Sequence, residues 1–190
     1  AEGLRVILHH LGAGIETQLE DDAAHPVFRE LVTPWRKFLG DNADARYHDA
    51  KVHSAGTYRI RGRTEGAIYV SFTVEAGAEE GAFPTGTVGV INDTEFDVGP
   101  DGSFELYLGG PCRDRGWLAL ADDASRVTVR HYWEQAAPPA TPPAPGLGLS
   151  IELVDGEGDV PSVPAVPTDA SVAASIRRMA TYVRSRTIEA

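Results

Sequence analysis

The stretch TYRIRGRTEGAIYVSFTVEA, residues 57–76, decides the fold class of this chain. Apolar and polar side chains alternate along it with a period of two, which is typical of a β-strand that buries one face. Gly66 lies between the two alternating halves and indicates a turn. The pattern therefore predicts two strands, 57–63 and 67–76, joined by that turn.

The same alternation continues downstream without an intervening helical pattern. The further strand segments are 94–109 (with an Asp-Gly turn at 101–102), 116–120, 126–134 and 149–154. Doubly wound folds alternate strands with helices, so this order argues against them. The sequence predicts a mainly β protein, an antiparallel β-sandwich or jelly roll, with helices at both termini.

Apolar residues recur at spacings of three and four near both ends of the chain, which indicates amphipathic helices. The expected helices are 3–20, 25–40 and 168–187, and residues 40–50 read as a polar connection. The first stripe is Leu4, Ile7, Leu8, Leu11 and Ile15, and the last is Val172, Ile176, Met179 and Val183, with Thr168 or Asp169 as the N-cap. We expect the terminal helices to pack on each other or on one sheet face.

These elements divide one structural domain into four consecutive segments. An N-terminal helical segment at 1–55 packs on a β-sandwich core at 56–135, followed by a proline-rich linker or strap at 136–148 and by a short strand and helix at 149–190. Proline cannot donate a backbone hydrogen bond, so the strap is expected to be extended.

Composition excludes several classes of protein. The chain has 190 residues and a formal net charge of −11, which argues against nucleic acid or an anionic membrane as the main partner. No apolar run approaches the ~20 residues of a membrane helix, and the N-terminus does not resemble a signal peptide. A single cysteine, Cys112, rules out an intrachain disulfide framework. We expect a cytoplasmic protein.

Three arginines at alternate positions, Arg59, Arg61 and Arg63, stand on one face of the first strand. They would suit recognition of a carboxylate or phosphate. However, nine acidic residues and no basic residue follow between 64 and 112. Cross-strand ion pairs therefore explain the row better, and the candidate partners are Glu75, Glu95, Asp97 and Glu105.

His131 and Trp133 share a face with two valines in VTVRHYW, residues 127–133, so both are expected to point into the sandwich. Small β folds keep ligand cavities there, and a histidine could act as a general base with an acidic partner such as Glu105. The alternative is a core histidine bonded to backbone or to a tyrosine such as Tyr58.

No phosphate-binding loop or dinucleotide fingerprint is present, so no cofactor is predicted. His48 and His53 lie five residues apart without the rigid spacing of a ligand pair, so no metal site is predicted.

Several motifs together are similar to a known family. YRIRGRTEGAIYVSFTVE, DGSFELYLGG, WLAL and VRHYWE occur in that order, and the chain resembles the bacterial domain-of-unknown-function 1214 family from about His25 to Thr187. The family usually has Asn where this chain has Gly116. The resemblance implies a jelly-roll-like fold and brings no catalytic residues. Longer members continue past the final helix into a second β-rich half. The resemblance therefore gives two alternatives, a fragment of such a protein or one chain of a two-chain protein, with a further C-terminal β domain or a second chain as partner.

Three functions follow as alternatives. The first is a module that binds a small molecule or sugar, with Tyr58, Trp117, Trp133, Arg59 and Arg130 as candidate ligand-binding residues, or that serves as the interaction half of a larger bacterial protein. The second is a hydrolase or lyase that uses His131 and Glu105. The third is a purely structural subunit, and a homo-oligomer is compatible with each.

Overall fold

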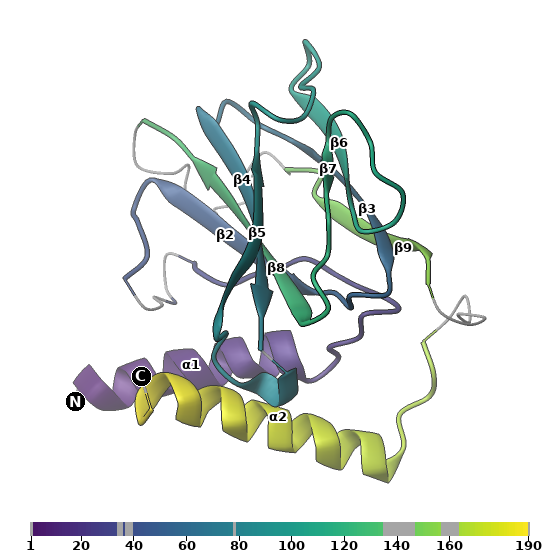
Figure 1. Cartoon of the computed structure of the whole chain (residues 1–190). Coiled ribbons are helices and arrows are strands. Elements are labelled where there is room, and N and C mark those ends of the chain that lie inside the picture. Colours follow the sequence, from purple (N-terminus) through teal and green to yellow (C-terminus); the bar gives the residue numbers. More distant parts are fainter. Residues whose placement is uncertain are drawn as a thin grey trace.

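The computed structural model describes residues 2–33, 36, 40–77, 79–134, 147–156 and 164–189. Two packed sheets lie above a pair of helices (Figure 1). The elements are α1 (Glu2–Gln18), β1 (Arg29–Glu30), β2 (Ala45–Lys51), β3 (Thr57–Arg63), β4 (Tyr69–Ala76), the 3-10 turn η1 (Glu79–Gly81), β5 (Gly86–Asn92), β6 (Ser103–Leu108), β7 (Trp117–Leu118), β8 (Ala124–Tyr132), β9 (Ser150–Asp155) and α2 (Asp169–Thr187). The predicted mainly β class with helices at both termini is confirmed.

The larger sheet has the strand order β1-β2-β8-β4-β5 and is antiparallel throughout. The smaller sheet has the order β7-β6-β3-β9, and only its β6–β7 pair is parallel. Both flanking segments contribute strands to the sandwich, because β2 lies within 1–55 and β9 lies within 149–190. The segment 136–148 falls almost entirely outside the described residues.

The core lies between the two sheets and takes alternate residues from both. Phe72 of β4, Phe104 of β6 and the loop residue Phe96 form its centre, with ring centroids 5.2 to 5.8 Å apart. All three are buried, as are the valines and leucines around them. The period-two pattern therefore predicted the buried face of these strands correctly.

Two predictions for the N-terminal third are wrong. Described residues of 25–40 form no helix; instead Arg29 and Glu30 pair with Asp49 and His48 of β2. The segment 40–50, expected as a polar connection, contains most of β2. Positions on β2 that face the core include Arg46 and His48, so hydrophobic alternation could not reveal this strand.

The hairpin predicted at 94–109 is only partly formed. Gly102, with φ of 81°, donates its amide to the Gly99 carbonyl at 2.8 Å, so the predicted turn is present. Its first arm is reduced to one bridge between Val98 and Phe104. The larger sheet contains one further strand, β5, that was not predicted. Its glycines break the alternation of apolar and polar residues.

The terminal helices pack side by side beneath one end of the larger sheet, as expected (Figure 1). They meet closely at Gly14, where an added Cβ would lie 3.1 Å from the Tyr182 ring. The N-cap of α2 is Thr168, whose hydroxyl accepts from the Ser171 amide. The faces of these helices that lie toward the sheet are largely small or polar, and this leaves a polar space between helices and sheet.

Candidate functional site

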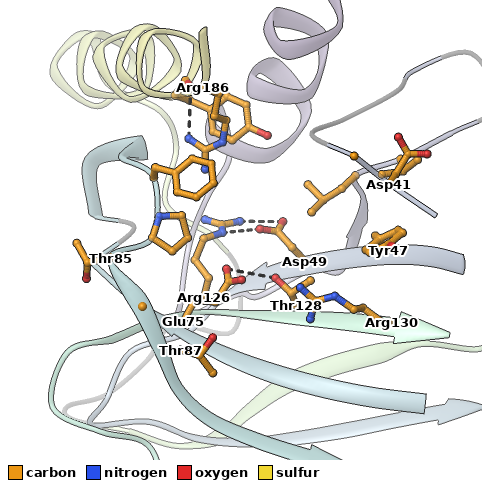
Figure 2. A pocket seen from close by; sticks show the side chains of 17 residues that line it. Asp41, Tyr47, Asp49, Glu75, Thr85, Thr87, Arg126, Thr128, Arg130 and Arg186 are labelled. Atoms are coloured by element: carbon orange, nitrogen blue, oxygen red, sulfur yellow. Dashed lines mark hydrogen bonds and ion pairs between the residues drawn. The ribbon is translucent and has the colours of Figure 1, made fainter. Parts of the chain in front are cut away.

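A cavity of ≈ 380 Å³ lies between the outer face of the larger sheet and the C-terminal half of α2 (Figure 2). The sheet forms its floor through β2, β8, β4 and β5. Phe83 to Thr87 close one side, and Tyr182 and Arg186 of α2 form the roof. Sheet, loop and helix must all be in place for the cavity to exist.

Strand register explains why the floor is polar. In β8 the valines face the core, so Arg126, Thr128 and Arg130 face outward. The neighbouring strands place Glu75 opposite Arg126 and Asp49 opposite Thr128. Three separate strands thus bring two carboxylates and two guanidinium groups to one patch of sheet.

All three nitrogens of the Arg126 guanidinium group donate hydrogen bonds to two buried acids. Its Nε and Nη2 donate to the two oxygens of Asp49 at 2.5 and 2.9 Å, and its Nη1 donates to Asp21 at 2.8 Å. Burial alone would lower the pKa of Arg126, but the two carboxylates raise it above the usual range. This cluster is structural, because it joins the segment after α1 to β2 and β8.

Glu75 has a different environment. Burial raises the pKa of its carboxyl group, and the nearby charge of Asp49 adds to this, while Arg130, the Thr128 hydroxyl and Arg126 oppose it. Thr128 donates to Oε2 of Glu75 at 3.3 Å. A carboxyl group with a raised pKa at the floor of a cavity is suited to proton exchange with a ligand.

Arg186 is a buried cation, 8% exposed, in the roof. Its Nη1 donates to the carbonyls of Gly81 and Tyr182 and to the Ser185 hydroxyl, and its guanidinium carbon lies 3.7 Å from the centroid of the Tyr182 ring. Within the described ranges it forms no ion pair, and its Nε has no hydrogen-bond partner. Burial lowers the pKa of Arg186. The charges of Asp49 and Glu75 offset part of this effect from beyond ion-pair distance. A buried cation without a directly paired carboxylate is costly, so this position favours an anion.

Arg130 is the second available cation. Its Nη1 donates to the Thr73 hydroxyl at 2.7 Å, and its guanidinium carbon lies 5.8 Å from the centroid of the Tyr47 ring. Among the described residues it pairs with no carboxylate at ion-pair distance. Arg130 was predicted to bind ligand, and the structure puts it in this cavity.

His131 lies where the sequence predicted, on the inner face of β8, but it does not border an open cavity. The residue is fully buried, between the rings of Phe104 at 6.3 Å and Trp133 at 6.1 Å. It lines neither the polar cavity, nor the groove between the helices, nor the small pocket beside Glu16 and Arg29. Neither ring nitrogen has a partner in strict hydrogen-bond geometry among the described residues. Burial lowers the pKa of His131 to about 4, and the Arg63 backbone opposes this only in part.

His131 and Glu105 do not come together, so the predicted acid–base pair is wrong. Glu105 alternates with Phe104 and Leu106 on β6 and therefore lies on the opposite, exposed face of that strand. There it binds Arg61 at 2.7 Å and the Tyr107 hydroxyl at 3.0 Å. The interior position of His131 makes it a core residue.

The arginine row is engaged in ion pairs, and two of its three members, Arg59 and Arg61, pair across strands as favoured from the sequence. Arg59 pairs with Glu152 on β9, Arg61 with Glu105, and Arg63 with Glu65 and Asp101. Of the four acids proposed as partners, only Glu105 serves. Glu75 belongs to the other sheet, Asp97 pairs with Arg115, and Glu95 accepts from the Asn92 amide. Arg59 is therefore engaged by an acid and lies far from the cavity lining.

The predicted aromatic ligand contacts are structural. The Tyr58 hydroxyl donates to the Ala23 carbonyl and accepts from the His53 amide, and burial raises its pKa to about 12. Trp117 donates its indole N–H to the Gly109 carbonyl, and Trp133 donates to the Glu65 carbonyl. None of the three lines the polar cavity.

Gly116 has a clear backbone role. Its φ is 61°, its amide donates to the Glu95 carbonyl, and its carbonyl accepts from the Tyr107 amide. Asparagine is among the residues that adopt positive φ most readily after glycine. An added Cβ would lie 3.2 Å from the Glu105 carbonyl oxygen, which is a tight contact, so the turn favours glycine.

Sequence reasoning missed Asp49, Glu75, Arg126 and Arg186 as site residues. The outward-facing residues of β4 and β8 are polar at several positions, and this pattern was a signal for the site. It was not specific, because a solvent-exposed sheet face would also be polar. Asp49 and Arg186 gave none, because β2 was not recognised and Arg186 lies off the apolar stripe of its helix. In the part of the chain that the structure covers, no three His, Cys, Asp or Glu side chains gather closely enough to hold a metal ion.

Fold and site together define a class: a two-sheet antiparallel sandwich with a helix pair that closes a polar cavity over one sheet. Among solved structures, the chain is similar to a putative uncharacterized protein from Burkholderia cenocepacia, with a TM-score of 0.80 and 26% identity over 98% of this chain. It is also similar to the VPA0106 protein from Vibrio parahaemolyticus, with a TM-score of 0.42 and 15% identity over 60% of this chain and 31% of that one. No protein-family model and no curated protein matches it.

The chain spans about half of the Burkholderia protein, covering 49% of its length. Neither described helix is long and apolar enough to cross a membrane.

Proposed function

We propose that this domain binds a small, hydroxylated anion in the cavity between the larger sheet and α2. The observation that carries the proposal is the pair Arg186 and Arg130, which line the cavity with no carboxylate of the described residues at ion-pair distance. Charge-assisted bonds from guanidinium groups to carboxylate or phosphate are strong and directional.

The size of the cavity limits the ligand. A volume of ≈ 380 Å³ corresponds to about a dozen non-hydrogen atoms if each occupies roughly the 30 Å³ of a liquid water molecule. Sugar acids, hydroxycarboxylates and sugar phosphates are of this size. Inorganic phosphate would fill only part of the cavity.

Other lining groups suit the remainder of such a ligand. Thr85, Thr87 and Thr128 offer hydroxyl groups, and Glu75 can accept from a ligand hydroxyl. Phe83 and Tyr47 add aromatic edges or faces. This distribution supports a polyhydroxylated anion over a purely apolar ligand.

The test is titration calorimetry with a panel of sugar acids, hydroxycarboxylates and sugar phosphates. Arg130→Met and Arg186→Met should each weaken binding of the best panel member by about 10-fold to 100-fold, the loss expected for a charge-assisted hydrogen bond. Arg130 is the primary position, because its side chain has fewer structural contacts than Arg186.

Arg61→Met is the matched control, since Arg61 is an arginine on the exposed face of the other sheet. It should leave the affinity unchanged. Unaltered affinity in both cavity variants, or an equal loss in the control, would show that the ligand binds elsewhere. A panel without any binding would refute the ligand class.

A second candidate function is proton transfer to or from the bound ligand by Glu75. The position of this carboxyl group at the cavity floor and its raised pKa favour it. Glu75→Gln should then still bind the panel member but no longer convert it. NMR spectroscopy of the ligand measures the conversion. Conversion that survives in Glu75→Gln would exclude this role.

We also propose membership of the bacterial domain-of-unknown-function 1214 family. Support comes from the order of the motifs along the chain and from the bacterial source of the similar Burkholderia structure. An alignment of close homologues that lacks the Asp-Gly-Ser-Phe turn and the Arg-x-Tyr strand would argue against membership.

A further inference from the structure

The apolar stripes of both terminal helices point away from the sandwich. On α1, Leu4 and Leu8 are 69% and 64% exposed, and on α2 Ile176 is 55% exposed. Leu11, Ile15 and Val172 continue the two stripes and are also exposed.

The opposite faces of the helices explain this orientation. The buried residues of α1 include His10, Ala13 and Thr17, and those of α2 include Ser175 and Ser185. A helix on a globular protein normally directs its apolar stripe toward the core. Here the polar cavity requires the reverse orientation.

The exposed stripes border one continuous apolar groove of ≈ 1200 Å³. Side chains from α1 (Leu4, Ile7, Leu11, Ile15) and from α2 (Ile176, Met179) line it. An exposed groove lined by large apolar side chains of two helices is a candidate interaction surface.

We propose that this groove binds the same groove of a second copy of the chain, so that two helix pairs form a four-helix bundle about a two-fold axis. Spacing supports a helical occupant. Leu4, Leu8, Leu11 and Ile15 follow one another at intervals of four, three and four residues, and so do Val172, Ile176, Met179 and Val183. These are the intervals of seams that pack against another helix by knobs-into-holes contacts.

Charge supports a second copy in particular. The exposed charges of α1 are Glu2, Arg5 and Glu16, which sum to −1. The exposed charges of α2 are Asp169, Arg177 and Arg184, which sum to +1, because Arg178 and Arg186 bond within the fold. A two-fold arrangement can place α1 of each copy against α2 of the other, which brings opposite charges together.

The size of the similar Burkholderia protein agrees with this arrangement. In that protein the present fold occupies 49% of the chain, which leaves room for a further unit of about the same size. A second copy would supply such a unit here without a covalent connection.

Sedimentation equilibrium and light scattering on the whole chain test the proposal. The expected mass is twice the 20.3 kDa of the chain. Leu11→Glu and Ile176→Glu each place a charge in the groove and should raise the dissociation constant at least tenfold, while far-UV circular dichroism stays unchanged because both side chains are exposed.

Val90→Glu is the matched control, an apolar-to-acid change at a 47% exposed position on β5. It should remain dimeric. A chain that is monomeric at every concentration overturns the proposal, and the face then belongs to another helical partner. A dimer that survives both groove variants, or open assemblies larger than two, also overturns it.

Discussion

At the scale of single residues, the imidazole of His131 shows how burial controls charge. Its folded-state pKa is about 4, whereas an exposed histidine in the unfolded chain titrates near 6.5. Between these values the unfolded chain binds more protons than the folded chain, so stability falls as the pH falls. The gap corresponds to about 3 kcal/mol of unfolding free energy, all of it lost below the folded pKa.

We therefore expect His131→Leu to reduce the acid sensitivity of the protein. Leucine has a similar volume and leaves no ring nitrogen unpaired, so stability at pH 7 should change by less than about 2 kcal/mol. Urea unfolding at pH 7 and pH 4.5 measures the difference. His48, whose pKa burial lowers to about 3, acts in the same direction but is present in both proteins.

His53→Gln provides the control, because His53 is exposed. Its acid sensitivity should match that of the parent chain. If His131→Leu loses as much stability between the two pH values as the parent does, His131 is not the group that titrates.

At the scale of elements, the sequence predicted strands that bury an apolar face, but it did not predict strands that are held mainly by backbone pairing. The strands β3, β4, β6 and β8 bury one apolar face each, and their alternation predicted them. By contrast, β1 and β2 are held by backbone pairing near a sheet edge, and polar residues occupy both of their faces. The segment 25–40 was expected to be helical, yet Arg29 and Glu30 pair with β2 and the Leu31 amide donates to the Tyr47 carbonyl.

The contact between η1 and α2 is the element-scale feature that we expect to be most sensitive. Gly81 has φ of 82°, and a Cβ added there would lie 2.2 Å from the Arg178 carbonyl oxygen. Gly81→Ala should therefore destabilise the fold by about 2 kcal/mol or more, from the strained backbone and the clash. Because Phe83 to Thr87 follow directly, the variant should also weaken ligand binding.

Gly86→Ala is the control for this prediction. Gly86 lines the same cavity, and an added Cβ would meet nothing within 4 Å. Its unfolding midpoint in urea should stay close to that of the parent chain. Equal loss of stability in both variants would mean that the contact with α2 is not the cause.

At the scale of the whole molecule, the cavity arises from long-range packing, which limits what sequence could reveal. Arg130 was identified because its strand was recognised. Asp49, Glu75 and Arg186 come together only when β2, β4 and α2 pack around β8. The spacing of these residues along the chain does not indicate that they meet. The negative net charge of the chain also gave no reason to expect a site lined by arginines.

The buried cluster of Arg126, Asp49 and Asp21 connects the segment after α1 to β2 and β8, so its removal should affect the entire fold. All three side chains are at most 8% exposed. Arg126→Met would leave two buried carboxylates without a counter-charge, at a cost of about 3–5 kcal/mol. Arg61→Met, which breaks an exposed pair with Glu105, should cost less than about 1 kcal/mol.

A double variant separates the charge effect from lost packing. Asp49→Asn removes one of the stranded carboxylates, so Arg126→Met combined with Asp49→Asn should be more stable than the sum of the two single losses predicts. Urea unfolding of the four proteins completes the cycle. Strict additivity would mean that the methylene groups of Arg126, rather than its charge, hold the N-terminal segment against the sheet.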